Sequence, residues 1–294
     1  MKPALAVQAA PVATGAQAGV ALAIVLWFIA GMSLLVAGIV SQARVDTQMA
    51  QLHVARAKAV AAGDGAIRLR LAELLTARTS PAAGGAGATS GYYTLGEDEV
   101  RVTLVPVAGL IDISSAAPEV LLGLFLQAGV EEDEARVLAE NVLKSRSPAA
   151  VPGARGGSGR LDAMEDLLRV PGMSRSLLDG LRDFIVVGEL AQGGMNWSVA
   201  PDEVLAVLAR VDETRAAGVR ARQGATAGTG VTVLARAWRA DAVVRYGDRN
   251  WLRRQWIEMS PAPGGELPWS VVRTEPPRVL RDNNDMTDRA ADAG

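Results

Sequence analysis

The residue types that most often carry enzyme chemistry are sparse in this sequence. There is one histidine, His53, and no cysteine, so a Ser-His-Asp triad, a histidine or thiolate metal site and a disulfide framework are not expected. The acidic run Glu131–Glu134 could bind a hard cation such as Ca²⁺, but it lacks the Asp-x-Asp-x-Asp-Gly spacing. A solvated helix start explains it better, because acidic residues favour a helix N-terminus. No glycine-rich run ends in the Lys-Ser/Thr of a phosphate loop. The sequence therefore predicts neither an enzyme nor a cofactor.

A second short motif raises the question of nucleic-acid binding. Val170–Ser174 (VPGMS) resembles the hairpin of helix-hairpin-helix modules, in which glycine N–H groups approach phosphate. Ser174 stands where that hairpin needs its second glycine, although Arg169, Arg175 and Arg182 supply some positive charge. A net charge of -2 and a pI of about 5.6 argue against a nucleic-acid surface. We therefore favour a structural turn and expect no nucleic-acid partner.

The most prominent structural feature of the sequence is one long apolar segment. Val20–Val40 contains no charged residue and directly follows Gly19. As a helix it would be roughly 30 Å long, the thickness of the hydrocarbon core of a bilayer. A signal peptide is the alternative, but the small residues Ala16–Gly19 precede the apolar run, whereas a signal cleavage site follows it. We therefore expect a single membrane-inserted helix.

The pattern beyond Val40 predicts that this helix continues. Residues 41–79 contain no proline, and their apolar residues fall mostly three or four apart, as in an amphipathic helix. Only Gly63-Asp64-Gly65 weakens the pattern, by about 1 kcal/mol per glycine relative to alanine. We expect one very long helix, half in lipid and half packed on a soluble domain.

These features together resemble the N-terminus of type IV pilin-like proteins. The shared features are a leader that ends in glycine, an apolar helix that starts at the next residue, and an amphipathic continuation. The resemblance implies that residues 1–19 are a prepilin leader and that residues 20–40 form the transmembrane and filament-core helix. It also implies that a prepilin peptidase cuts between Gly19 and Val20 and methylates the new amine of Val20.

The fifth mature position distinguishes one branch of that family. Most members carry glutamate there, where this sequence has Ile24. In pilin-like filaments this glutamate pairs with the terminal amine of the subunit above, and a charged group in hydrocarbon otherwise costs about 2.5–3.5 kcal/mol. Its absence is typical of the general secretion pathway protein K family, the minor pseudopilins of type II secretion systems. It fits a tip subunit with nothing above it, and an ordinary lipid-facing residue explains Ile24 equally well.

The remainder of the chain alternates between strand-like and helical patterns. Strand-like patterns cover residues 100–105, 110–113, 231–240, 242–246, 251–259 and 269–274. Helical patterns cover residues 118–126, 131–143, 162–168, 174–185 and 201–209. Connectors rich in small residues lie at 80–91, 145–160 and 222–230, and the tail 281–294 is expected to be disordered. We expect a pilin-like sheet region at 91–110 and 229–275, with an all-helical domain inserted at 111–214.

Two segments of this helical region resemble each other. The segments are Asp112–Leu121 and Asn196–Leu205. Each begins with Asp or Asn, continues with small residues typical of a turn, and has a proline at the predicted start of a helix. Duplication and a recurring helix cap explain this equally well. In the K family, similar segments bracket a helical domain inserted into the pilin sheet, and Asn196–Leu208 with Leu168–Met173 match them most closely. The resemblance implies calcium sites. This chain has Leu143–Ser147 in place of the family's Asp-Trp-Arg-Asp-like segment, so no clear calcium motif supports them.

The sequence thus predicts an α+β fold: a pilin-like long N-terminal helix on an antiparallel sheet, with an inserted all-helical domain. The resemblance implies a non-enzymatic minor pseudopilin at the tip of the type II secretion pseudopilus. It would initiate or cap assembly and support the export of folded proteins from the periplasm across the outer membrane. The implied partners are other minor pseudopilins, the major pseudopilin filament, the prepilin peptidase and the inner membrane, which it would cross once with its C-terminal domain in the periplasm.

Two other functions were weighed against this one. One is a minor pilin of a type IV pilus or DNA-uptake machine, and the other is a signal-anchored periplasmic enzyme, for which the sequence shows no active-site cluster. Charge does not decide the membrane orientation, because Lys2 precedes the apolar run whereas Arg44, Arg56 and Lys58 follow it. The six tryptophans could form a partner-facing patch, but we expect most of those beyond the apolar run to pack in the core.

Overall fold

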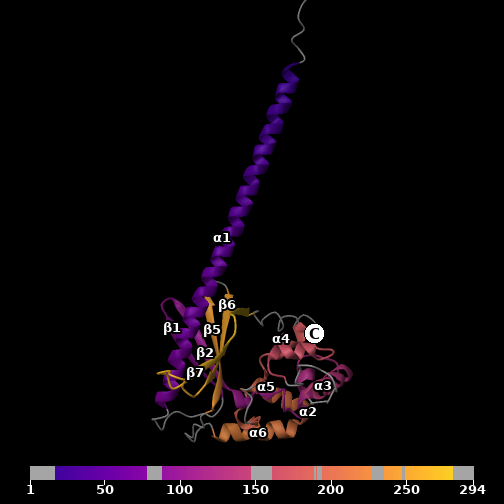
Figure 1. Cartoon of the computed structure of the whole chain (residues 1–294), viewed down its shortest axis with the longest axis vertical. Coiled ribbons are helices and arrows are strands. Elements are labelled where there is room, and N and C mark those ends of the chain that lie inside the picture. Colours follow the sequence, from indigo (N-terminus) through magenta and orange to yellow (C-terminus); the bar gives the residue numbers. More distant parts are fainter. Residues whose placement is uncertain are drawn as a thin grey trace, which may run out of the picture. The chain divides into compact units, whose positions relative to one another are not determined.

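The computed structural model describes residues 17–77, 88–146, 161–188, 190, 194–226, 235–246 and 249–280. It divides into two units, Met1–Ala55 and Arg56–Gly294. The predicted tail at 281–294, most of the predicted connectors and nearly all of the predicted leader lie outside the described residues. The predicted fold class is confirmed: the chain has a long N-terminal helix, an antiparallel sheet and further helices (Figure 1).

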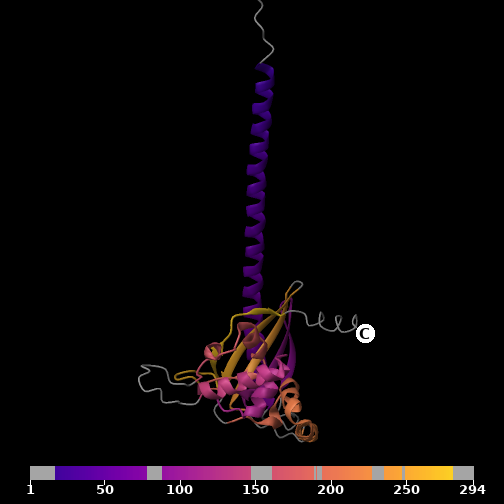
Figure 2. The same ribbon diagram turned by 90° about the vertical axis from the view of Figure 1, so that its right-hand side faces the viewer.

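The N-terminal helix α1 runs without a break from Gln17 to Ala77 (Figures 1 and 2). The Gly63-Asp64-Gly65 patch, predicted to weaken it, lies inside a continuous helix. In the second unit, the residues of α1 that are buried recur every three or four positions, which places them on one side of the helix. They are Ala59, Ala62, Ala66, Ile67, Leu71 and Leu74.

The main sheet is antiparallel and lies in the second unit. Its strands follow the order β1 (Thr89–Leu95), β2 (Asp98–Pro106), β5 (Ala237–Tyr246), β6 (Arg249–Glu258) and β7 (Ser270–Thr274). A short strand, β8 (Arg278–Leu280), continues along the same side of β6 and pairs with Asn250–Leu252. The hairpin β5–β6 is therefore central, and β1 and β7–β8 form the two edges.

The two faces of this sheet are covered by different elements, because successive residues of a strand point to opposite faces. The α1 face carries Ala242 and Arg253, which lie against Gly63 of α1. The insert face carries Asp241 and Arg254 on the same two strands. It faces the segment between α4 and β4, because Arg254 forms an ion pair with Asp183.

The helical region lies between β2 and β5 in the sequence. Its helices are α2 (Pro118–Gln127), α3 (Glu132–Arg146), α4 (Arg175–Leu181), α5 (Asp202–Val211) and α6 (Glu213–Thr226). The 3₁₀ turns described in this region are η1 (Val107–Gly109), η2 (Met164–Arg169) and η4 (Trp197–Val199). Inside this region β3 (Ile111–Asp112) pairs in parallel with β4 (Ile185–Val186).

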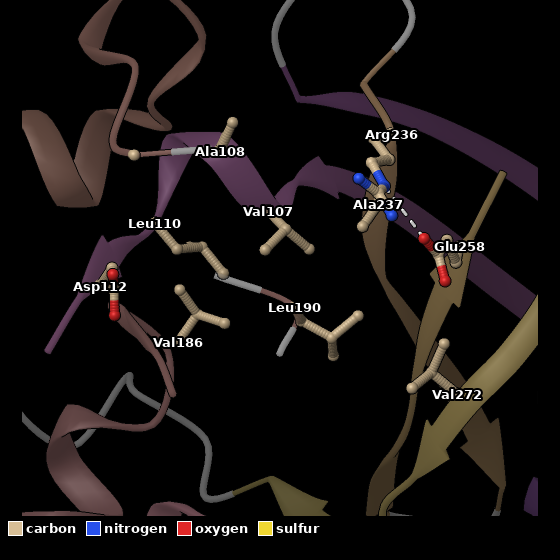
Figure 3. Close-up of a pocket in the computed structure, with 11 residues that line it drawn as sticks. Val107, Ala108, Leu110, Asp112, Val186, Leu190, Arg236, Ala237, Glu258 and Val272 are labelled. Atoms are coloured by element: carbon tan, nitrogen blue, oxygen red, sulfur yellow. Dashed lines mark hydrogen bonds and ion pairs between the residues drawn. The ribbon is translucent and has the colours of Figure 1, made fainter. Parts of the chain in front are cut away.

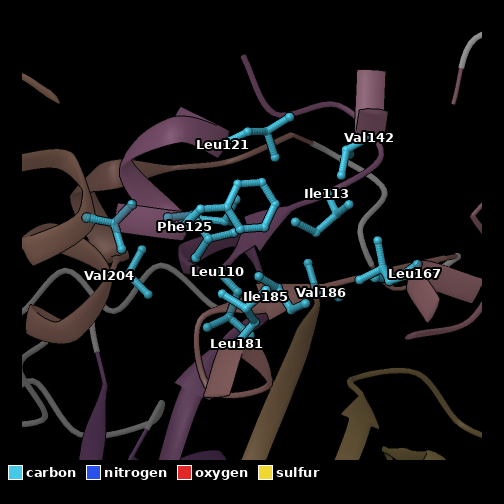
Figure 4. Close-up of a cluster of buried hydrophobic side chains, with 14 of the residues drawn as sticks. Leu110, Ile113, Leu121, Phe125, Val142, Leu167, Leu181, Ile185, Val186 and Val204 are labelled. Carbon is cyan, nitrogen blue, oxygen red and sulfur yellow. The ribbon is translucent and has the colours of Figure 1, made fainter. Parts of the chain in front are cut away.

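Helix α2 is at the centre of this region, in contact with α3 and α5, and α5 contacts α6. Pro118 occupies its first turn, where a missing N–H costs nothing. The Phe125 side chain is fully buried. Figure 4 shows it among Leu110, Leu121, Leu181 and Ile185, which come from the beginning and the middle of the region's sequence.

Several local predictions were wrong. The helix predicted at 174–185 ends earlier, at Leu181 of α4. Ile185 lies instead in the strand β4. The carbonyls on either side of it, of Phe184 and Val186, accept hydrogen bonds from the N–H groups of Ile111 and Ile113. The segment 110–113 does form a strand, but it pairs with β4 and stays outside the main sheet.

Element boundaries also differ from the prediction. Strand β1 begins at Thr89, inside the connector predicted at 80–91, because its small residues pair with β2. Helix α6 continues past the predicted end of the helical region at Thr214, and reaches Thr226 inside the connector predicted at 222–230. The two strands predicted on either side of Asp241 are one strand, because Arg254 neutralises that carboxylate within the sheet.

Gly63 is predicted to be required for the packing of α1 on the sheet. A Cβ atom at this position would lie 2.8 Å from Cβ of Arg253, in contact with a part of the side chain that cannot swing away. We expect Gly63→Ala to lower the free energy of unfolding by about 1–3 kcal/mol through overpacking. Denaturant unfolding of the full chain in detergent, followed by tryptophan fluorescence, measures this.

Gly218 in the exposed part of α6 is the matched control. A Cβ atom there would meet nothing within 4 Å. Gly218→Ala should therefore raise stability by about 0.5–1 kcal/mol, from helix propensity alone. Equal changes in both variants would show that α1 does not need the close approach at Gly63.

Candidate functional site

The first unit presents a long apolar surface. Every residue from Ala21 to Val40 is exposed, and Trp27 has a relative exposure of 80%. The described residues contain one helix long and apolar enough to cross a membrane, and it lies near the N-terminus. An apolar surface of this extent requires lipid or the apolar surface of another protein.

The sequence-predicted residues Gly19, Val20 and Ile24 lie at the start of this surface. Gly19 and Val20 are in the first turn of α1. Ile24 follows about one turn later and is 62% exposed. No carboxylate occurs between Val20 and Val40, so this segment offers no anionic group to a neighbouring amine.

The second unit contains a polar contact that the sequence analysis missed. Asp64 of α1 accepts hydrogen bonds from Nε and Nη2 of Arg253 at 2.7 and 3.1 Å, and from Nε2 of Gln255 at 2.8 Å. Arg253 also donates to the Glu275 carbonyl at 2.9 Å. Because both Arg253 and Gln255 lie on β6, this bidentate contact fixes the position of α1 along the sheet. The signal was an acidic residue within the predicted apolar stripe of the helix.

On the insert face, an ionic cluster joins the sheet to the helical region. It consists of Asp183, Arg239, Asp241, Arg254 and Arg278. Arg254 forms a bidentate pair with Asp241, with N–O distances of 2.6 and 2.9 Å, and it lies 2.7 Å from Asp183. Arg239 donates to the Asp183 carbonyl at 2.6 Å, and Arg278 pairs with the Asp183 carboxylate at 3.1 Å. Asp183 therefore contacts three arginines from three strands.

The charges of Asp183 and Arg254 are stabilised by their partners, whereas burial lowers the pKa of Arg239 despite the nearby carboxylates. Burial alone would raise the pKa of Asp183, but Arg254, Arg239 and Arg278 stabilise the carboxylate, and the pKa is lowered. Burial alone would lower the pKa of Arg254, yet Asp241 and Asp183 raise it. Removing one partner of a buried pair leaves the other charge uncompensated, which costs about 3–5 kcal/mol. The cluster therefore holds the helical region in one position on the sheet.

A third contact fixes the edge strand β1 to α1. The Tyr93 hydroxyl donates to Glu73 at 2.5 Å, and Arg70 pairs with the same carboxylate at 3.1 Å. The Tyr93 ring also lies over Gly91, where a Cβ atom would be 2.9 Å from the hydroxyl. Partial burial, the hydrogen bond to Glu73 and its negative charge raise the pKa of Tyr93 from 10.0 to about 12.

A cavity of about 150 Å³ lies between the helical region and β5–β6 (Figure 3). Its lining is mainly apolar, with Asp112, Arg236 and Glu258 as the ionisable groups. Arg236 donates to Glu258 at 3.0 Å, and Asp112 accepts from the Ser114 N–H and the Ser115 hydroxyl. These groups are already paired with one another or with the backbone, so the cavity does not present an acid, base or nucleophile to a substrate.

The other residues nominated from the sequence have structural roles. Glu131–Glu134 lie at the exposed start of α3, where Arg136 pairs with Glu132 and Asp133 at 2.8 and 3.2 Å. The described residues contain no group of three or more His, Cys, Asp or Glu side chains that could hold a metal. His53 is exposed on α1.

The hairpin-like segment Val170–Ser174 forms the turn between η2 and α4. Gly172 has a φ of 88°, and the Ser174 hydroxyl caps α4 by accepting from the Leu177 N–H at 3.1 Å. All three nearby arginines are in ion pairs with carboxylates: Arg169 with Asp166, Arg175 with Asp179, and Arg182 with Asp179 and Glu165. The favoured interpretation, a structural turn, agrees with this geometry, which offers phosphate no unpaired arginine.

The two similar segments of the helical region share one local structure. The Asp112 carboxylate accepts from the Ser114 N–H at 2.8 Å, and Asn196 Oδ1 accepts from the Ser198 N–H at 3.0 Å. Each is a side-chain turn that precedes a helix, and a serine hydroxyl adds a second bond at 2.6 Å in both. The two segments therefore share one turn geometry, which a recurring cap or a duplication would each produce.

The tryptophans lie mainly in the core, as predicted. Trp238 and Trp256 are almost fully buried, and Trp251 and Trp269 are buried at 5% and 9% exposure. The Trp256 indole donates to Glu275 at 3.0 Å, and the Arg273 guanidinium lies 4.4 Å from its ring centre. These side chains are not free to serve as anchors for a partner.

Comparison with known proteins shows a similarity among solved structures. No family model and no curated protein matches the chain. Among solved structures, it is similar to a chain in the crystal structure of the GspK-GspI-GspJ complex from the enterotoxigenic Escherichia coli type 2 secretion system. The alignment covers 80% of this chain and 99% of that chain, with 12% sequence identity and a TM-score of 0.46.

Tyr93 is predicted to titrate near pH 12, and its raised pKa makes the fold sensitive to high pH. A phenol with a raised pKa favours the folded state below its unfolded value of 10.0, and this contribution is lost as the pH rises toward about 12. Ultraviolet absorbance of the folded chain should show a tyrosinate transition near pH 12 that is absent in Tyr93→Phe. Glu73→Gln should move that transition toward pH 10, and Tyr92→Phe should leave it unchanged. A Glu73→Gln titration identical to that of the parent would contradict the contact.

Proposed function

We propose that this protein is a minor pseudopilin at the tip of a type II secretion pseudopilus. In this proposal α1 anchors it in the inner membrane with a single pass, and the second unit lies in the periplasm. It initiates or caps assembly together with other minor pseudopilins and the major pseudopilin filament, and so supports export of folded proteins across the outer membrane. It has no catalytic role.

The main support for the proposal is the structure of helix α1. One uninterrupted helix begins with an exposed, uncharged segment directly after Gly19 and ends packed against an antiparallel sheet. A helix that only anchors a domain in a bilayer needs about 20 apolar residues and no rigid continuation. Here α1 continues beyond the apolar segment to Ala77, and its last turns pack on the sheet of the second unit, which supports a filament subunit.

The position of Ile24 supports a place at the tip. In pilin-like filaments, a subunit with another subunit above it carries a carboxylate at this position. That carboxylate pairs with the terminal amine of the subunit above. That carboxylate is costly in hydrocarbon unless it is paired, by about 2.5–3.5 kcal/mol. This chain has no acidic residue from Val20 to Val40, so it avoids the cost and has no group with which to receive such a neighbour.

The helical region supports the same place. It is inserted between β2 and β5, and the ionic cluster joins it to β5, β6 and β8 on the insert face of the sheet. A rigid mass at this position would obstruct a further subunit. This part of the proposal concerns capping, and it depends on the cluster remaining intact.

The first test is the N-terminus of the mature protein. Cells with an active prepilin peptidase should yield a chain that begins at Val20 with a methylated amine, and cells without it should yield a chain that retains Gly19. N-terminal sequencing and mass spectrometry of the membrane-bound protein measure this. A mature chain that begins at any other residue would overturn the proposal.

The second test is Ile24→Glu, which restores the carboxylate that most pilin-like proteins have. If nothing lies above this subunit, the new carboxylate is unpaired in the membrane core, and we expect at least tenfold less assembled protein at a cost of about 2.5–3.5 kcal/mol. Ile24→Leu is the control and should assemble normally. Filament recovery and secretion of an exported protein give the readout, and an Ile24→Glu chain that assembles as well as the parent would contradict a tip position.

A further inference from the structure

The two edges of the main sheet differ in how they are protected against pairing with another strand. Along β7–β8 the register with β6 shifts between Trp256 and Ile257. Pro276 and Pro277 separate β7 from β8, and Arg273, Glu275 and Arg278 add charge. Register shifts, prolines and charges are the devices by which natural proteins prevent edge pairing. This edge is therefore guarded, although Val271 and Val272 are about half exposed.

The opposite edge, β1, has none of these devices. Thr89–Leu95 (TSGYYTL) contains no proline and no charged residue, and seven of its residues pair with β2 in unbroken register. Its other side pairs with no strand in the part of the chain that the structure describes. A long, regular and uncharged edge of this kind is a template for an additional strand.

The β1 strand is also held in place before any partner arrives. Tyr93 joins it to Glu73 of α1, and the Ser90 and Thr103 hydroxyls lie 3.0 Å apart across the β1–β2 pair. A fixed edge loses little conformational freedom on pairing, so more of the hydrogen-bond energy remains for binding.

The side chains next to this edge indicate the chemistry of the partner. Ser90, Tyr92 and Thr94 point to the same face and are exposed, Tyr92 at 80%. Arg101 lies directly opposite Tyr92 on β2, and it has no carboxylate partner among the described residues. Tyr92 and Arg101, together with Glu99 and Arg245, line a hollow of about 450 Å³, in which the two arginines outnumber the one carboxylate. An added strand would bring its own side chains beside Tyr92, within reach of the Arg101 guanidinium.

We propose that β1 is a docking edge for an extended segment of another protein, which adds a strand to the sheet and carries an acidic side chain on the Arg101 face. Main-chain hydrogen bonds to β1 supply the general affinity, and contacts with Tyr92 and Arg101 select the segment. This inference stands without the proposed function, since it depends only on the edge and on the adjacent charge.

Amide hydrogen exchange of the full chain tests this proposal. The probe is the chain in membrane vesicles from the cells that make it, compared with the same chain purified in detergent. We expect amides of Thr89–Leu95 to exchange about tenfold more slowly in the vesicles, and amides of Ser270–Thr274 to exchange equally in both. Equal exchange of β1 in the two preparations would overturn the proposal.

Substitutions on the exposed side of the edge make the test specific. Tyr92→Lys adds the kind of charge that guards other edges and should abolish the slow exchange of β1. Val272→Lys on β7 is the matched control and should leave it unchanged. Arg101→Glu should reduce the protection, and Arg101→Lys should retain most of it. Amides of β2 and β5 report whether each variant is folded, so a loss confined to β1 cannot arise from unfolding.

A photoreactive side chain at Thr94 identifies the occupant. An adduct with a segment of another protein that contains Asp or Glu, lost in Tyr92→Lys, supports the proposal. An adduct with a second copy of this chain, together with β1 protection in detergent that rises with protein concentration, would overturn it in favour of self-association.

Discussion

Strand β6 connects the two elements that cover the sheet, because consecutive residues of a strand must point to opposite faces. Arg253 points to the α1 face and binds Asp64, whereas Arg254 points to the insert face and binds Asp241 and Asp183. The helix and the helical region are therefore positioned by neighbouring residues of one strand. A shift of β6 by one residue would exchange these two arginines and break both contacts.

This arrangement explains why charged groups occur at positions where apolar packing would also give stability. Apolar contacts tolerate sliding of one element along another, whereas a bidentate arginine–carboxylate pair is satisfied in one geometry. Asp64 accepts bonds from two residues of β6, and Asp183 contacts arginines from β5, β6 and β8. The hydrophobic core supplies the stability of the second unit, and these ion pairs define its geometry.

The sequence predicted the long helix and the fold class well, because both depend on local periodicity over many residues. It failed where distant residues decide the outcome. The sequence predicts a break between two strands at Asp241 and a weak point of α1 at Gly63-Asp64-Gly65. Both predictions fail because the arginines that bind Asp241 and Asp64 lie on another strand, β6. Ile24 and the apolar run were identified from sequence alone, but the contrast between β1 and β7–β8 appears only once the strand order is known.

The apolar part of α1 and the edge strand β1 are both surfaces that a partner can cover, but they are different in kind. On α1 the exposed groups are apolar side chains, which are costly to leave in water. On β1 they are main-chain N–H and C=O groups beside an exposed tyrosine, which water solvates but which can pair with another strand. The opposite edge of the sheet is protected by the prolines and charges along β7–β8. A membrane or a bundle of apolar helices can cover α1, whereas an added strand can pair with β1.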